Sequence, residues 1–200
     1  MVVATGGGRL VCLAVGEGAL TEAASVAIDA EVACLDASPL EEGAEAATLL
    51  AVGTWGMDLR IFTLPGLAKV AREAVGGEVI PRSVLFSSFD GVPYLLCGLG
   101  DGHLITFRLA EEAAAAAAAG GAAAAAGAAL GPLLLERKKL ALGTKPITLR
   151  TFRSRGASHV FAASDRPTII YASNRKLLYS NLNENEVRAD GGGGSGSRMF

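Results

Sequence analysis

The glycine-rich stretch LGDGH, at residues 99–103, is the part of the chain whose residue types could do chemistry. Glycine-rich loops hold phosphate when they lead from a strand into a helix, because the first amides of the helix bind the anion. Here the loop leads into HLITFRL, whose β-branched and aromatic residues predict a strand. We therefore expect Gly100, Asp101 and Gly102 to form a hairpin turn that tolerates positive φ, with a nucleotide-binding enzyme as a minor alternative.

Other polar residues do not form a catalytic pattern. The histidines, His103 and His159, have no cysteine or carboxylate at metal-ligand spacing. Asp90, Asp101 and Asp165 lie in predicted turns, where aspartate commonly hydrogen-bonds its own backbone. The sequence contains no nucleophile elbow, zincin or Walker motif. We therefore predict no catalytic residue, no enzyme activity, no cofactor and no metal.

Three cysteines, Cys12, Cys34 and Cys97, are widely spaced, and each lies in an apolar run. This spacing is neither a CxxC pair nor an even disulfide framework. Free cysteine packs as a small hydrophobic residue, so we expect buried thiols in a reducing compartment. The first residues, MVVATGGGRL, have no charged segment ahead of a long apolar core, and we expect no secretory signal.

The net charge is close to neutral. Lys and Arg number 18 against 20 Asp and Glu, which gives a formal net charge of -2. No overall field therefore draws the chain to nucleic acid or to an anionic membrane, and any nucleic-acid contact must be local or indirect.

An uncharged, alanine- and glycine-rich segment covers residues 113–135. Its length would permit a membrane helix, but it holds few large apolar residues and is interrupted by Pro132. We expect a low-complexity insertion, flexible or transiently helical, over residues 111–131.

One pattern, an apolar run, a small-residue break and a second β-rich run, occurs four times. The copies are VVATGGGRLVCLAV, LLAVGTWGMDLRIFTL, YLLCGLGDGHLITFRL and VFAASDRPTIIYAS. Matching positions are Ala4, Val52, Cys97 and Ala163. With the insertion set aside, the interval is about 45 residues, the period of a four-stranded propeller blade.

The repeat predicts an all-β fold, a partial and open β-propeller of three whole blades preceded by three quarters of another. We expect the propeller to cover residues 1–182, with blades at about 1–28, 31–75, 82–142 and 147–182. Residues 183–200, which include GGGGSGSRMF, are predicted to be a disordered tail. So few blades cannot close a ring, and we expect the sequence to be a fragment of a longer protein.

Alternating strand directions predict which residues share a rim of the propeller. Glu31 begins the first strand of its blade, and Trp55 lies in the turn between the second and third strands. Both therefore belong to one rim, and the insertion projects from the opposite one. A tryptophan in a glycine-containing turn is a plausible contact anchor. The alternative is that Trp55 folds back over the blade edge.

Several segments together resemble one family of proteins. They are EVACLDASPL, GGEVIPRSVLFSSF, YLLCGLGDGHLITFRL, RKKLALGTKPITLRTFRS and FAASDRPTIIYASNRKLLYSNLN. Outside the insertion, Val2 to Leu182 resembles the family of the large subunit of the damaged-DNA-binding complex, the adaptor of cullin-RING ubiquitin ligases. The resemblance implies the middle of three propellers, with positions Glu31 and Trp55 on the cullin-docking face. The family pattern after the tryptophan is close to W-T-D-I-S-x-R, and WGMDLR is one residue shorter.

The resemblance also implies a function and partners. We expect a non-catalytic scaffold in the nucleus and cytoplasm, linked to DNA repair and protein ubiquitination. The expected partners are a cullin scaffold and substrate receptors, with nucleic acid reached only through the full complex and no membrane or small-molecule substrate. The alternative is a propeller subunit of a splicing or pre-mRNA cleavage and polyadenylation complex that binds nucleic acid.

Overall fold

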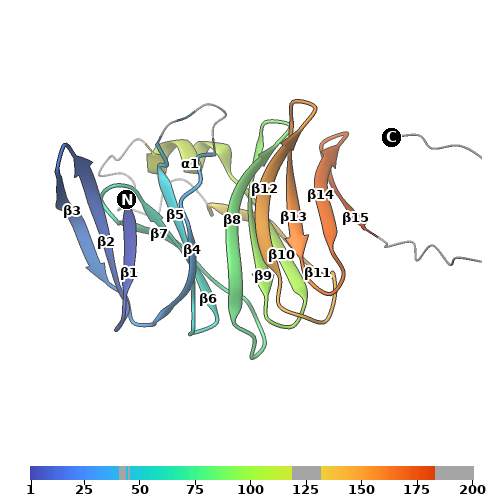
Figure 1. Ribbon diagram of the computed structural model, residues 1–200, viewed down its shortest axis with the longest axis horizontal. Coiled ribbons are helices and arrows are strands. Elements are labelled where there is room, and N and C mark those ends of the chain that lie inside the picture. The colour runs from blue at the N-terminus through green and yellow to red at the C-terminus, as the bar shows by residue number, and fades with distance from the viewer. Residues whose placement is uncertain (41–43, 45, 119–131, 183–200) are drawn as a thin grey trace, which may run out of the picture.

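The structure, a computed structural model, describes residues 1–40, 44, 46–118 and 132–182. These residues form four antiparallel sheets, in which neighbouring strands are consecutive along the chain (Figure 1). The first sheet contains β1 (Val2–Thr5), β2 (Arg9–Gly16) and β3 (Ala19–Ala27). The second contains β4 (Val32–Asp36), β5 (Leu49–Thr54), β6 (Asp58–Thr63) and β7 (Lys69–Ala74).

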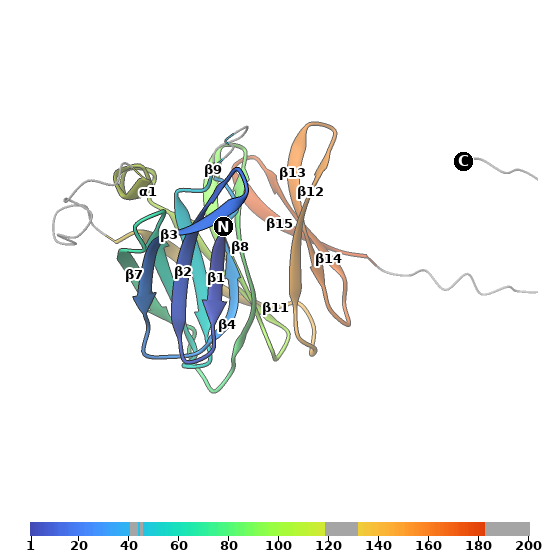
Figure 2. The same cartoon turned by 60° about the vertical axis from the view of Figure 1, so that its left-hand side comes forward.

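The third sheet contains β8 (Pro81–Phe89), β9 (Val92–Leu99), β10 (His103–Leu109) and β11 (Leu134–Ala141). The fourth contains β12 (Thr148–Ser154), β13 (Ala157–Ala163), β14 (Thr168–Ser173) and β15 (Lys176–Asn181). A short helix, α1 (Glu111–Ala118), follows β10. The sheets stand one after another and fan out without closing a ring (Figure 2).

The predicted fold class is confirmed, because three sheets of four strands follow one of three strands. The start of the predicted insertion forms α1, while residues 119–131 and the predicted tail, 183–200, lie outside the described residues. The division of the chain at residue 182 stays a prediction. No helix in the described ranges has the length and apolar character needed to cross a membrane.

Three apolar clusters fill the spaces between successive sheets, and the third sheet is buried on both faces. On β10, Ile105 and Phe107 pack toward the second sheet, while Leu104 packs toward the fourth. On β9, Cys97 and Leu96 divide in the same way. Successive side chains of a strand point to opposite faces of the sheet. The alternation of residues in the sequence therefore determines which of them pack against each neighbouring sheet.

Two glycines permit the backbones of neighbouring sheets to approach closely. A Cβ on Gly53 of β5 would lie 2.7 Å from Pro81 Cβ and 2.7 Å from Cys34 Sγ. A Cβ on Gly98 of β9 would lie 2.8 Å from the carbonyl oxygen of Ile147. Each glycine stands near the end of the second strand of its sheet and faces the residues that begin the next sheet. The spacing of the sheets at these two points therefore depends on the missing side chain.

The LGDGH stretch is a hairpin turn, as predicted. β9 ends at Leu99 and β10 begins at His103, so the turn leads into a strand and not into a helix. Of the turn residues, Gly102 alone has a positive φ, +85°, while Gly100 and Asp101 do not need it. Asp101 Oδ1 accepts a hydrogen bond from the His103 amide at 3.1 Å, which closes the turn from within.

The cysteines carry free thiols. Cys12 and Cys97 are buried as predicted, whereas Cys34 is half-buried at the junction of the second and third sheets. Burial raises the pKa of Cys34 to about 11 and raises the pKa of Cys97 above its ordinary value. Both groups are therefore neutral thiols near neutral pH and act as packing residues.

Candidate protein-docking surface

One rim of the molecule is built from the turn between β1 and β2 in the first sheet and from the turns between the second and third strands of the other sheets. In the second sheet, the Trp55 amide donates to the carbonyl of Glu31 at 2.9 Å. In the third, the Gly100 amide donates to the carbonyl of Ile80 at 3.1 Å. Each turn is thus bonded to the segment that precedes the first strand of its own sheet. The rim is consequently a row of similar, backbone-supported turns.

In the first three sheets, the same turns also bond the residue that follows the last strand of the sheet. The carbonyl of the last turn residue accepts a hydrogen bond from the amide of that residue, at 2.6 to 3.0 Å. The pairs are Gly8 with Ile28, Met57 with Val75, and Gly102 with Leu142. These bonds satisfy backbone groups that a strand end would otherwise leave free. The repeat in the sequence therefore reappears as a repeat of turn contacts.

Glu31 and Trp55 lie side by side on this rim, as their places in the repeat predicted. Besides the 2.9 Å backbone bond between them, Glu31 Oε1 accepts a weak hydrogen bond from the Gly7 amide at 3.4 Å. Glu31 therefore touches the turn of the first sheet and the turn of the second. Trp55 is 53% exposed, so half of the side chain is open to a partner. We name Glu31 and residues 55–57 the docking rim, and residues 55–57 the Trp55 turn.

The Trp55 turn has three residues, Trp55, Gly56 and Met57, between β5 and β6. Met57 has a positive φ of 60°, and its amide donates to the carbonyl of Thr54 at 3.1 Å. A left-handed third residue is the usual geometry of a three-residue hairpin. The shortened WGMDLR segment is thus accommodated by a compact turn that contains the half-exposed Trp55.

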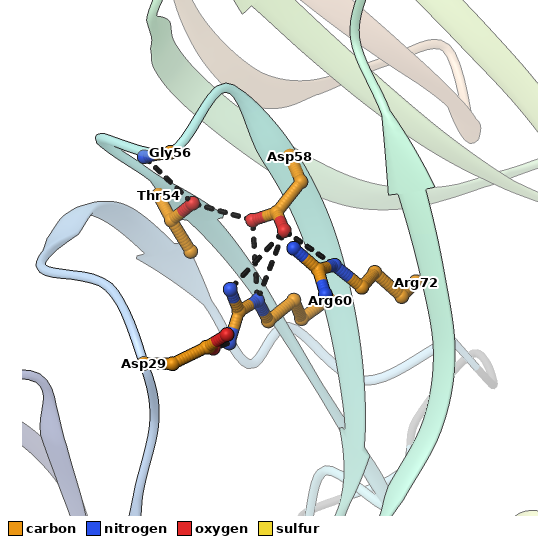
Figure 3. A network of polar contacts seen from close by, with 6 residues as sticks. All are labelled: Asp29, Thr54, Gly56, Asp58, Arg60 and Arg72. Atoms are coloured by element: carbon orange, nitrogen blue, oxygen red, sulfur yellow. Dashed lines mark hydrogen bonds and ion pairs between the residues drawn. The ribbon is translucent and has the colours of Figure 1, made fainter.

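A network of polar side chains lies directly beneath this turn (Figure 3). Thr54 Oγ1 accepts from the Gly56 amide at 3.1 Å and donates to Asp58 Oδ1. The two residues that flank Trp55 in the chain are therefore connected to one carboxylate. Asp58 is the first residue of β6, and its side chain is 4% exposed. The turn is consequently anchored from inside the sheet.

Arg60 is the centre of the network. Its Nε donates to Asp58 Oδ1 at 3.1 Å, its Nη2 donates to Asp58 Oδ2 at 3.1 Å, and its Nη1 donates to Asp29 Oδ1. Arg72, on the neighbouring strand β7, donates from Nε to Asp58 Oδ2 at 2.6 Å. The Arg60 side chain is 3% exposed, so its charge depends on these acids. Two carboxylates and two guanidinium groups balance one another.

The pKa values of the network follow from its contacts. Burial would raise the pKa of Asp58, but hydrogen bonds from Arg60, Thr54 and Arg72 outweigh burial and leave it below its ordinary value. The hydrogen bond from Arg60 lowers the pKa of Asp29. Burial would lower the pKa of Arg60, yet its bonds to the two acids raise it. Asp58, Asp29 and Arg60 are therefore charged at neutral pH.

We expect this network to make the free energy of unfolding depend on pH in the acidic range. Because the pKa of Asp58 and Asp29 in the folded chain is below the ordinary value of 3.8, their stabilisation is complete above that pH. It is lost as the pH falls from 3.8 toward the folded-state pKa. Asp58→Asn should therefore lower Tm at about pH 5, with a smaller further fall in Tm at about pH 3 than the parent chain shows. Thermal melting followed by circular dichroism measures this, and parallel curves for the two chains would contradict it.

The other candidate residues lie apart from the docking rim's network. Asp165 accepts from the amides of Thr144 at 2.9 Å and Lys145 at 3.1 Å, so it supports the loop before β12 as well as its own turn, which the sequence did not predict. Its pKa is lowered, chiefly by the Thr144 amide. Asp90 has a positive φ in the turn between β8 and β9. Asp165 and Asp90 therefore act as structural residues of turns.

The histidines differ in position. His103 begins β10, with Nδ1 3.0 Å from Asp101 Oδ2. His159 lies inside β13, and its ring packs against Phe152 and Tyr171 at centroid distances of 5.3 and 6.2 Å. Within the described part of the chain, no group of three or more His, Cys, Asp or Glu residues could hold a metal ion.

The opposite rim carries a hollow of about 890 Å³ between the sheets and α1. It is lined by residues of the turns after β4, β8 and β12, including Asp90 and Gly156, and by Glu111 of α1. Since strands alternate in direction, these turns lie at the end of the sheets away from Trp55. α1 therefore leaves the docking rim uncovered.

Sequence reasoning placed Glu31 and Trp55 but missed Asp29, Asp58 and Arg60. A signal was present in DLRIFT, where Asp58 and Arg60 are two residues apart in an otherwise apolar strand. Residues at that spacing share one face of a strand. The partners from other strands had no comparable signal.

Comparisons with known proteins identify the family. The model of the RSE1/DDB1/CPSF1 second beta-propeller matches residues 1–189. The chain is 49% identical over 188 residues to DNA damage-binding protein 1b of Arabidopsis thaliana, which is 94% of this chain and 16% of that protein. It is 48% identical over the same shares to DNA damage-binding protein 1 of Solanum lycopersicum. It is 42% identical to DNA damage-binding protein 1 of Drosophila melanogaster over 88% of this chain and 14% of that protein.

The chain thus spans at most 16% of the length of these relatives. The resemblance noted from the sequence is confirmed, since a family model covers nearly the whole chain and relatives share almost half of its residues. The four sheets described above agree with a β-propeller. The chain belongs to the RSE1/DDB1/CPSF1 second β-propeller family and is similar to DNA damage-binding protein 1.

Proposed function

We propose that the chain is a non-catalytic part of a ubiquitin-ligase adaptor and that its docking rim contacts a cullin scaffold. The observation that carries the proposal is the half-exposed Trp55, held on a turn whose flanking residues are tied to a buried carboxylate. Aromatic side chains on rigid supports are typical anchors of protein interfaces. Glu31 beside it supplies an acid at the edge of the same surface.

The wider setting of the proposal comes from the relatives and from the resemblance. The relatives are named DNA damage-binding proteins, and the resembled family joins cullins to substrate receptors. We accordingly propose a role in DNA repair and protein ubiquitination, in the nucleus and cytoplasm. Substrate receptors would bind the larger assembly, and nucleic acid would be reached through it.

The test is a binding assay with the full 200-residue chain and a purified cullin. Trp55→Ala combined with Glu31→Ala should weaken binding by about 30-fold, because loss of an interface anchor typically costs about 2 kcal/mol or more. Circular dichroism should stay unchanged, since both side chains are exposed. Phe152→Ala is the matched control, because Phe152 is a partly exposed aromatic residue on the fourth sheet.

Unchanged cullin binding by the double variant would contradict the proposed surface. Co-purification from cells addresses the class of partner. Recovery of cullin peptides supports the adaptor role. Recovery of splicing or cleavage factors in place of a cullin would instead support the RNA-processing alternative.

A further inference from the structure

The polar network beneath the Trp55 turn joins the second sheet to the segment that links it to the first sheet. Asp29 belongs to the segment between β3 of the first sheet and β4 of the second. Arg60 belongs to β6, inside the second sheet. The contact between Arg60 Nη1 and Asp29 Oδ1 therefore crosses from the sheet that carries Trp55 to the segment that leads into it (Figure 3).

The contacts form a closed circuit around the docking rim. Asp29 is two residues before Glu31, whose carbonyl accepts the Trp55 amide. From Trp55 the chain returns through Thr54 Oγ1 to Asp58, and from Asp58 through Arg60 to Asp29. Loss of any one of these contacts opens the circuit. An intact circuit fixes the position of the Trp55 backbone relative to the backbone of Glu31.

The burial of the network indicates what each part does. Arg60 and Asp58 are almost fully enclosed, so their pairing belongs to the fold itself. Asp29 is different, because its side chain is 72% exposed although it bonds the buried guanidinium. An exposed acid at the end of a buried pair contributes little to the total free energy of folding. Its contact can nonetheless determine local geometry, because it is the link that crosses to the β3–β4 segment.

We propose that Asp29, Arg60 and Asp58 are positioning residues that hold the Trp55 turn against the β3–β4 segment, so that the docking rim is formed before a partner binds. The expected effect on partner binding rests on the proposed function. A surface that is already ordered loses less conformational freedom on association, which increases affinity without adding a contact. Asp29 is the residue at which this can be tested without disturbing the core.

The experiment uses the fluorescence of Trp55, the single tryptophan of the sequence. In the full chain without partner, Asp29→Ala should lower the fluorescence anisotropy of Trp55, because the turn gains motion. Asp29→Glu keeps a carboxylate within reach of Arg60 and should restore the anisotropy. Asp101→Ala is the matched control, since Asp101 supports the equivalent turn one sheet along and should leave Trp55 unaffected.

Binding to the purified cullin gives the second readout. Asp29→Ala should weaken affinity by about three- to tenfold, the cost of ordering one or two side chains at an interface, and Asp29→Glu should restore it. Unchanged Trp55 anisotropy in Asp29→Ala overturns the positioning role, whatever the affinity does. Lower anisotropy with unchanged cullin binding leaves the positioning role standing and instead contradicts the proposed docking surface.

Discussion

Phe86→Ala is expected to destabilise the chain by about 3–5 kcal/mol, the usual cost of removing a fully buried phenylalanine ring. Phe86 is 1% exposed and lies on β8, within the apolar cluster between the second and third sheets. Alanine would leave a cavity that the surrounding strands cannot fill, because their hydrogen-bonded ladders restrict their movement. Urea unfolding followed by circular dichroism measures the change as a shift in midpoint.

The control for this prediction is Phe152→Ala. Phe152 is 37% exposed and contacts the ring of His159 on the surface of the fourth sheet. The same chemical change there should cost less than about 1.5 kcal/mol, because a partly exposed ring removes less area from water. Equal losses in the two variants would contradict the assignment of Phe86 to the core.

Gly102→Ala is expected to cost about 2–5 kcal/mol through two separate effects. The φ of Gly102 is +85°, a conformation that costs an L-residue about 1–2 kcal/mol. An added Cβ would also collide with the backbone of Gly143 and would lie 2.7 Å from the amide nitrogen of Thr144. Backbone atoms cannot rotate away, so overpacking of about 1–3 kcal/mol is added. Urea midpoints of the parent chain and the variant give the value.

Gly91→Ala separates the two effects. Gly91 has nearly the same positive φ, +77°, in the turn between β8 and β9, but no atom lies within 4 Å of the added Cβ. We expect a loss of only about 1–2 kcal/mol from the backbone conformation. A loss in Gly102→Ala no greater than this would show that the loop before β12 can move aside.

The sheets could be predicted from the sequence because each strand and turn has a local residue pattern, and this pattern repeats along the chain. In YLLCGLGDGHLITFRL, the alternation of apolar residues and the small-residue break identify two strands and the turn between them. The beginning of β3, at Ala19, is less clearly marked in the sequence. Residues 19–22 read ALTE and have little strand preference of their own. Pairing with β2 through a tight turn at Gly18 extends the strand.

The docking rim could be predicted only in outline. Glu31 and Trp55 share a rim because strands alternate, which is a property of any such blade. The spacing of Asp58 and Arg60 indicates that they share one face of a strand. Neither composition nor spacing encodes the contact between Arg60 and Asp29, which appears in the sequence as an ordinary loop acid. The support of the candidate site therefore became visible only in three dimensions.

The closely packed glycines of β5 and β9 affect how successive sheets are arranged relative to one another. Gly53 and Gly98 each stand near the turn between the second and third strands of their sheet, and at these points the neighbouring sheets approach closely. A methyl group at either position would clash with the first residues of the next sheet and push the adjacent blades apart. The resulting change in curvature would alter the angle between successive turns along the rim. Two absent side chains thus help to set the arc over which a large partner can lie.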